Sequence, residues 1–396
     1  MLLAFIVIII FLLHIQFYVR NIMLGTDEGT YFIFTIRYLF DRATSIDALY
    51  FSTGCLVCFA AGYLITHHRR HGISPSAKYQ PVAIYSLPMW PLVAAGMLQI
   101  LASFTLAVQV GFNYQAIAEQ LEKVGFIFEL RVVFLLFISH LLLNVPLKDV
   151  IKSNRYRAAR ITVYLYIIAM LLLQVRSRVF EIGAVLAFTH LMWQGDRLKL
   201  KYFFFLGIAL IVPNIIVLGR LGWPDDTAML IDGVFSFEYS VLFNNLLSAS
   251  IEAGPNTTGS FTFTPSLGLL LPSPIRALLG IDVVKSDYYY DLSQVANIGN
   301  GGFSLLAELY TNFGWYALPV LGGAGALIGW LNGGAMRVGR ASMLTSAAPL
   351  LYAAFILAFR NDMGVFIKYS IQLLLIAIIL NYLTTINSST NTVRKP

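Results

Sequence analysis

Charged side chains are scarce in this sequence. Asp, Glu, Lys and Arg make up 12% of the 396 residues, whereas hydrophobic residues make up 58%. The mean hydropathy is +0.73. Because soluble domains carry about 25% charged residues, this chain has too few polar side chains to cover a water-exposed surface. The composition excludes a soluble globular protein and predicts an all-α polytopic membrane protein.

Cysteine is rare in the sequence, and the common catalytic motifs are absent. The two cysteines, Cys55 and Cys58, form a C-x-x-C inside an apolar segment without a second ligand pair. We therefore expect two small packed residues rather than a redox or metal site. The sequence contains no G-x-x-x-x-G-K-[ST], H-E-x-x-H or G-x-S-x-G. We expect no metal or cofactor, and any donor substrate must arrive already activated.

Apolar segments of the length of a membrane span are abundant, since an apolar core of about 30 Å needs about 20 helical residues. Ten are predicted, over residues 1–19, 48–66, 84–110, 129–147, 161–175, 179–195, 202–219, 303–333, 346–360 and 363–385. The first has no basic segment before it and no small-residue cleavage site. We expect a retained span there rather than a signal peptide.

Basic clusters fall on one side of these spans, in the turns after the even-numbered ones. This asymmetry predicts that both termini face the cytoplasm. The chain then divides into a bundle of about seven helices (1–219), a large outer loop with interfacial helices (220–302), and about three helices with a cytoplasmic tail (303–396). The loop contains aromatic residues and carboxylates, so we expect a folded lid rather than a linker. Residues 26–47 are expected to form the first outer loop and to continue as an interfacial amphipathic helix through Phe34, Ile36, Leu39 and Phe40.

Three arginines break the one-sided distribution of basic residues. Arg176 and Arg178 lie at the tip between two short spans, and Arg360 lies with Asp362 at another. A span of about fifteen residues rises about 22 Å, so both tips are expected at the depth of the outer lipid headgroups. Arginine suits bidentate phosphate binding, which predicts a cationic pocket for a lipid-linked phosphate or pyrophosphate. The alternatives are snorkelling arginines or internal pairs, Arg178 with Glu181 and Arg360 with Asp362.

Polar side chains recur at the start of the span 303–333. Ser304, Glu308, Thr311 and Asn312 have helical spacing and are expected on one face. A carboxylate within a membrane helix must face a water-filled cavity or be paired, so a catalytic and a structural role both stay open. Further along this span, Gly325, Gly329 and Gly333 form a small-xxx-small ladder, which predicts close helix packing within the chain rather than a dimer seam.

Residues 170–370 contain several short motifs. They read Gly301-Gly-Phe-Ser-x-x-Ala-Glu308-x-Tyr310-x-Asn312-Phe-Gly314, Phe359-Arg360-Asn-Asp362, Arg176-Ser-Arg178 and Phe237-Glu238, with a large outer loop that begins at Arg220. These motifs resemble those of Wzy-type O-antigen polymerases. The resemblance implies a bacterial inner-membrane glycosyltransferase of the GT-C-like class, active on the periplasmic face in the synthesis of O-antigen or a related surface polysaccharide. Such enzymes move a growing glycan from undecaprenyl pyrophosphate to another lipid-linked repeat unit. A chain-length regulator is a further candidate partner, and nucleic acid is not expected.

In that chemistry, preorganised arginines stabilise the departing pyrophosphate without a metal. Glu308 or Glu238 is the candidate general base for the acceptor hydroxyl. The residues predicted to bind substrate are Arg176, Arg178, Arg220, Arg276, Tyr310, Asn312, Arg360 and Asp362.

Three other functions stay open from the sequence. Asp27 and Glu28 resemble the acidic pair of polyprenyl-phosphate-sugar transferases of the GT-C class, which transfer one sugar. An O-antigen ligase has a similar arginine-rich outer face and a large late loop. A flippase or other transporter of lipid-linked oligosaccharides needs polar residues through the whole bundle, whereas charge within the spans is concentrated near the outer end here.

Overall fold

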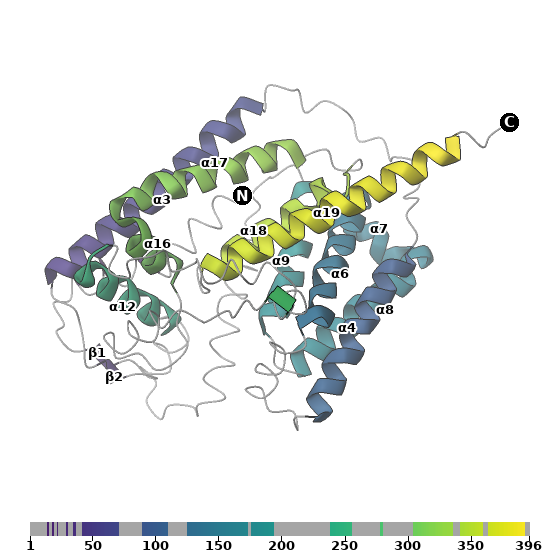
Figure 1. Ribbon diagram of the computed structural model, residues 1–396, viewed down its shortest axis with the longest axis horizontal. Helices are drawn as coiled ribbons and strands as arrows, with labels where there is room; N and C mark the ends of the chain where they lie inside the picture. The colour runs from purple at the N-terminus through teal and green to yellow at the C-terminus, as the bar shows by residue number, and fades with distance from the viewer. Residues whose placement is uncertain are drawn as a thin grey trace.

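The computed structural model is helical almost throughout (Figure 1). It describes residues 14–15, 18–19, 22, 29–30, 35–36, 42–70, 89–109, 125–172, 176–193, 238–255, 278–279, 304–335, 341–358 and 363–392. Within that part the only strands are β1 (Gly29–Thr30) and β2 (Thr35–Ile36), which pair antiparallel. The predicted all-α class is therefore confirmed for these residues, apart from this short pair. The interfacial helix expected over 26–47 is wrong where β1 and β2 lie.

Four helical segments of the described chain are long and apolar enough to cross a membrane. They are Ala43–His67, Trp90–Gln109, Leu305–Trp330 and Phe366–Leu383, and Leu130–Asn144 and Thr345–Ile356 are shorter apolar helices. These are the helices of a membrane-embedded protein. The predicted span 202–219 and most of the predicted span 1–19 lie outside the described residues.

Seven of the predicted spans correspond to single helices. These helices are α3 (Arg42–Arg70), α4 (Trp90–Gln109), α6 (Gly125–Asn144), α8 (Arg157–Leu172), α9 (Arg176–Trp193), α18 (Ala348–Ala358) and α19 (Met363–Thr392). The predicted span 303–333 differs, because it consists of two helices, α16 (Leu305–Phe313) and α17 (Ala317–Ala335), joined by the 3-10 turn η4 (Gly314–Tyr316). Its apolar composition indicated a span but not this break.

Helices α3 and α17 pack side by side over much of their length (Figure 1). They run in the same direction, since Gly54 in the middle of α3 faces Leu318 at the start of α17, and Thr66, further along α3, lies beside Ala326, further along α17. The Thr66 hydroxyl donates to the carbonyl oxygen of Ala326 at 2.9 Å. This hydrogen bond crosses between the two helices and adds to their van der Waals packing.

Glycines allow this close approach. A Cβ at Gly62 would meet the carbonyl oxygen of Gly322, and a Cβ at Gly325 would meet that of Phe59. A Cβ at Gly329 would likewise meet α3. The prediction that this ladder packs against another helix of the same chain is therefore confirmed at Gly325 and Gly329.

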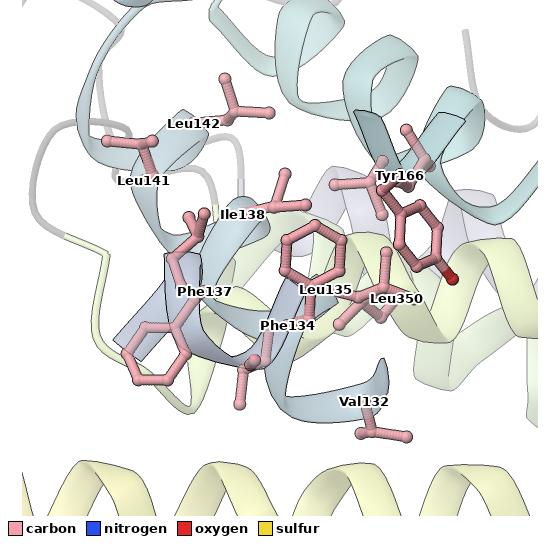
Figure 2. Packing of buried hydrophobic residues seen from close by; sticks show 14 of the residues in the cluster. Val132, Phe134, Leu135, Phe137, Ile138, Leu141, Leu142, Tyr166 and Leu350 are labelled. Atoms are coloured by element: carbon pink, nitrogen blue, oxygen red, sulfur yellow. The ribbon is translucent and has the colours of Figure 1, made fainter. Parts of the chain in front are cut away.

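Helices α4, α6, α8 and α9 form a second group (Figure 1). In it, α4 and α9 each pack against both α6 and α8. Figure 2 shows the apolar side chains of α6 together with Tyr166 of α8 and Leu350 of α18. The rings of Phe134 and Tyr166 lie 5.0 Å apart, and Gly96 of α4 lies so close to Phe134 that a larger residue would not fit. Residues 132–138 of α6 form a continuous apolar segment.

Helix α18 joins the two groups. Phe355 stacks on Phe59 of α3 at 5.2 Å, and Tyr352 contacts Phe188 of α9 at 5.7 Å. Leu350 and Ala354, on another side of α18, pack into the cluster around α6. Because residues 352–356 of α18 are buried and its side chains contact both groups, its position ties both groups of helices together.

The end of α6 is anchored by polar side chains. Asn144 donates to the carbonyl oxygen of Ala341 at 3.1 Å and accepts from its backbone N–H at 3.0 Å. His140 Nδ1 lies 2.9 Å from the hydroxyl of Ser346, in the 3-10 turn η5 (Thr345–Ala347) that leads into α18. Helix α18 therefore starts where α6 ends, and we call this contact the α6–η5 junction.

The connection from α6 to α8 is compact. It comprises α7 (Leu147–Lys152) and the 3-10 turn η2 (Asn154–Tyr156). The guanidinium of Arg160 donates to the carbonyl oxygens of Val150 at 2.7 Å and Ser153 at 2.8 Å. Free carbonyls at a helix end need such donors, so Arg160 has a structural role besides its contribution to the predicted orientation.

The seam between α3 and α17 predicts unequal effects of one substitution at two neighbouring glycines. Gly325→Ala places a Cβ against the Phe59 backbone, and we expect it to lower the free energy of unfolding by about 1–3 kcal/mol. Gly323→Ala is the control, because that Cβ meets nothing within 4 Å, and alanine should favour the helix by about 1 kcal/mol at most. Thermal unfolding of the purified protein in detergent measures both, and equal midpoints would contradict the seam.

Candidate functional site

Glu308, the first candidate general base, lies in the first turn of the short helix α16. Its side chain is only 1% exposed, and every residue from Leu305 to Asn312 is buried. Ser304 caps the helix, because its hydroxyl accepts from the backbone N–H of Ala307 at 3.3 Å. A carboxylate at this depth is held in one place by a capped and fully packed helix.

The other polar side chains expected beside Glu308 bond to the backbone of α16. Thr311 donates to the carbonyl oxygen of Ala307 at 3.0 Å, and the Asn312 amide donates to that of Glu308 at 2.8 Å. Ser304 thus caps the helix that carries the carboxylate, and Thr311 and Asn312 satisfy hydrogen-bonding groups of their side chains on its backbone. Asn312 was predicted to bind substrate, and in the structure its amide makes this backbone contact.

Helix α16 ends at Gly314, which has a φ of 54°. This backbone conformation is strained for any residue with a Cβ. A Cβ there would also lie 3.1 Å from Cβ of Pro255, directly after α12 (Glu238–Ala253). Gly314 thus lets the chain turn from α16 into α17 against the end of α12.

Glu238, the second candidate base, is the first residue of α12. The side chain of Glu238 lies outside the described part. Residues 246–250 of the same helix are buried, and α12 packs against α16 and α3. Ser248 also lies within hydrogen-bond distance of the buried Tyr18 hydroxyl, at 3.2 Å. The structure therefore packs the two helices that carry the candidate carboxylates against each other.

Tyr310 lies between α16 and α3. Its ring contacts Phe51 edge-on at 5.1 Å and Trp315 at 6.5 Å, and it is 7% exposed. Sequence reasoning predicted that Tyr310 binds substrate. In the structure, this side chain packs the site helix onto α3.

The buried charges of the second helix group form a pair that the sequence did not predict. Arg131 of α6 lies 3.5 Å from Glu181 of α9, and both side chains are at most 10% exposed. The guanidinium of Arg131 also lies over the ring of Tyr369 in α19, 5.3 Å from its centre. Glu181 was expected to pair with Arg178 if it had a partner within the chain. The observed partner lies fifty residues earlier, and its signal was an arginine and a glutamate near the starts of two predicted spans.

The other predicted arginines are placed only in part. Arg176 and Arg178 belong to the first turn of α9 rather than to the tip before it, and their side chains lie outside the described part. Arg220, Arg276, Arg360 and Asp362 all lie outside the described residues. The last two occupy the short connection between α18 and α19.

The directions of the helices show at which helix ends α16 and the Arg131–Glu181 pair lie. Arg131 and Glu181 pair near the starts of α6 and α9, and Trp193 donates to the Leu142 carbonyl oxygen at 2.5 Å near their ends. These two helices are therefore parallel. Only residues 336–340 separate α17 from Ala341 at the α6–η5 junction. Helix α16 and the Arg131–Glu181 pair thus both lie at the helix ends away from this junction.

Metal ligands are not clustered in the described part of the chain, where no group of three or more His, Cys, Asp or Glu residues could hold an ion. Cys55 and Cys58 are both free. Cys55 is buried in the cluster around α3 with Phe51 and Phe59. The expectation of two small buried residues is therefore confirmed for Cys55, whereas Cys58 is only partly buried.

Comparisons with known proteins leave the chain's own residues as the basis for any functional inference. A scan against protein-family models, a search of curated proteins and a search of solved structures each found no match. The residues on which such an inference can rest are Glu308 in α16, the start of α9, and the buried pair at Arg131.

Replacement of Gly314 by alanine should lower the stability of the protein through two separate effects. In Gly314→Ala, backbone strain of about 1–3 kcal/mol adds to the contact with Pro255. Gly254→Ala is the matched control, because Gly254 also has a positive φ, of 85°, but its Cβ would meet nothing within 4 Å. We expect a larger fall in the thermal unfolding midpoint for Gly314→Ala, and equal falls would show that the contact contributes nothing.

Proposed function

We propose that this chain is a membrane-embedded glycosyltransferase that polymerises undecaprenyl-pyrophosphate-linked oligosaccharide repeat units. Its active site would face the periplasm of a bacterial inner membrane. The observation that best supports this proposal is the placement of Glu308, which is 1% exposed on a capped, packed helix. A catalytic group on a rigid element can be held at one distance from one hydroxyl.

The reaction asks two things of the protein. A new bond forms between the acceptor hydroxyl oxygen and the anomeric carbon of the donor, while the bond from that carbon to the pyrophosphate oxygen breaks. The hydroxyl proton goes to a general base, for which Glu308 is the first candidate and Glu238 the second. The bonding electrons leave with the lipid pyrophosphate, whose added negative charge needs cationic groups nearby.

The start of α9 has the chemistry for that second task. Arg176 and Arg178 lie in its first turn, where the helix dipole places partial positive charge and backbone N–H groups lack helical partners. Arginine and a helix N-terminus both favour a phosphate group. Arg360 would add to this site from the connection between α18 and α19.

A transporter is less well supported. Transport of an oligosaccharide needs a polar path from one side of the membrane to the other. Residues 132–138 of α6, between Arg131 and Ser139, are apolar (Figure 2), so α6 itself offers no such path. A single-sugar transferase and a ligase differ from the polymerase in their products.

Glu308→Gln tests the base. It keeps the shape of the side chain and removes the proton acceptor, so we expect polymerisation of purified lipid-linked repeat units to fall by about 100-fold or more, with substrate still bound. Gel analysis of the products measures this against the wild-type ladder. A single addition by the wild-type protein would indicate a transferase, and no product would contradict the proposal.

Two further variants show whether the loss of activity is specific to Glu308. Glu238→Gln should lose less activity if Glu238 only positions the acceptor. Glu252→Gln is the matched control, because it removes an exposed carboxylate near the end of the same helix α12 and should leave the ladder unchanged. A larger loss in Glu238→Gln than in Glu308→Gln would move the base to Glu238.

The arginines predict a second pattern. Alanine at Arg176, Arg178 or Arg360 should abolish polymer while folded protein remains in the membrane, and lysine should restore little because it lacks the guanidinium fork. Arg157→Ala, at the exposed start of α8, is the control and should keep full activity. Full activity in all three alanine variants would leave only the explanation that these arginines reach the membrane surface.

A further inference from the structure

We propose that Arg131 is a positioning residue that sets the relative placement of the starts of α9 and α19. Arg176 and Arg178, which are expected to bind pyrophosphate, lie in the first turn of α9, and Arg360 precedes α19 in the sequence. The inference rests on the proposed function and deepens it. Its basis is that Arg131 contacts one residue within the first two turns of each helix, Glu181 and Tyr369.

The first contact reaches α9. Glu181 follows Arg178 by three residues and Arg176 by five, so all three lie within the first two turns of one helix. A helix transmits a displacement of one turn to the next, because each turn is hydrogen-bonded to its neighbour. The position of Glu181 against Arg131 at 3.5 Å therefore determines where the start of α9 lies relative to α6.

The second contact reaches α19. Tyr369 lies in the second turn of this helix, seven residues after Asp362. Its ring is 9% exposed and lies under the guanidinium of Arg131 at 5.3 Å. A cation over an aromatic face prefers a defined geometry. The same guanidinium thus orients the helix that begins directly after Arg360 and Asp362.

The surroundings make this arrangement specific. Tyr166 of α8 lies within electrostatic range of both Arg131 and Glu181, and Phe134 packs against it (Figure 2). Two apolar residues of similar volume stabilise a protein about as well as a buried ion pair does. A buried pair between helices from distant parts of the chain instead favours one register of those helices over others.

Removal of both charges separates positioning from stability. A single replacement leaves one buried charge and should unfold the protein, so the informative variant is the double replacement Arg131→Met with Glu181→Met. We expect this protein to keep a thermal unfolding midpoint close to that of the wild type. Its affinity for undecaprenyl pyrophosphate in lipid nanodiscs should fall by about tenfold or more, with undecaprenol as the uncharged comparison ligand.

Two further variants test the contact with α19. Tyr369→Phe keeps the aromatic face and should bind undecaprenyl pyrophosphate as the wild type does, whereas Tyr369→Leu should bind it more weakly. Arg155→Met is the matched control, because it removes an arginine that lies 5.8 Å from a tyrosine ring, that of Tyr156, in the connection beyond the end of α6. It should leave the affinity unchanged.

The outcomes distinguish this inference from the function on which it rests. Wild-type affinity in a folded double variant would overturn the positioning role and leave the polymerase proposal intact. A wild-type protein that binds undecaprenyl pyrophosphate no better than undecaprenol would overturn the proposed function, and the inference with it. Weakened binding in the folded double variant and in Tyr369→Leu, but not in Arg155→Met, would support the positioning role.

Discussion

Burial of charge is the constraint on which the second helix group depends. Arg131 and Glu181 lie in apolar helices, where an unpaired charge is strongly unfavourable and a paired one is tolerated. Their 3.5 Å contact brings residues near the starts of α6 and α9 together, and the contact of Trp193 with Leu142 near the helix ends shows that the two helices are parallel. The guanidinium of Arg131 also lies over Tyr369 of α19. One buried charged pair therefore lies where three helices meet.

The packing of α3 against α17 depends on a different constraint, which is the short distance between the backbones of these two helices. Glycines at the seam bring α3 and α17 so close that Thr66 reaches the backbone of the opposite helix. Apolar lipid provides little hydrophobic drive for helix association, so close packing and hydrogen bonds carry more of it. Helix α18 then packs against both groups through Phe355 and Leu350. Together these contacts leave little freedom in how the two groups meet.

The candidate site combines rigidity with irregular backbone. Helix α16 is too short to cross a membrane, and Gly314 separates it from α17. Backbone breaks at membrane depth are tolerated where protein covers them, and Gly314 is buried against Pro255, close to the end of α12. The break places the buried carboxylate of Glu308 in a short helix before the longer α17 rather than in the middle of one continuous helix.

For the part of the chain that the structure describes, the sequence by itself determined most of the helical segments, because a backbone in an apolar medium must satisfy its own hydrogen bonds. It also indicated Glu308 and the glycine ladder, since a carboxylate or a small-residue repeat is conspicuous in an apolar span. Only the tertiary structure decided that Glu181 pairs with Arg131, that the span 303–333 breaks at Gly314, and that α12 is buried against α16. The physical reason is that nearly uniform apolar helices carry no amphipathic pattern to identify their neighbours. Partners distant in the chain are chosen by packing and helix register, which no local pattern records.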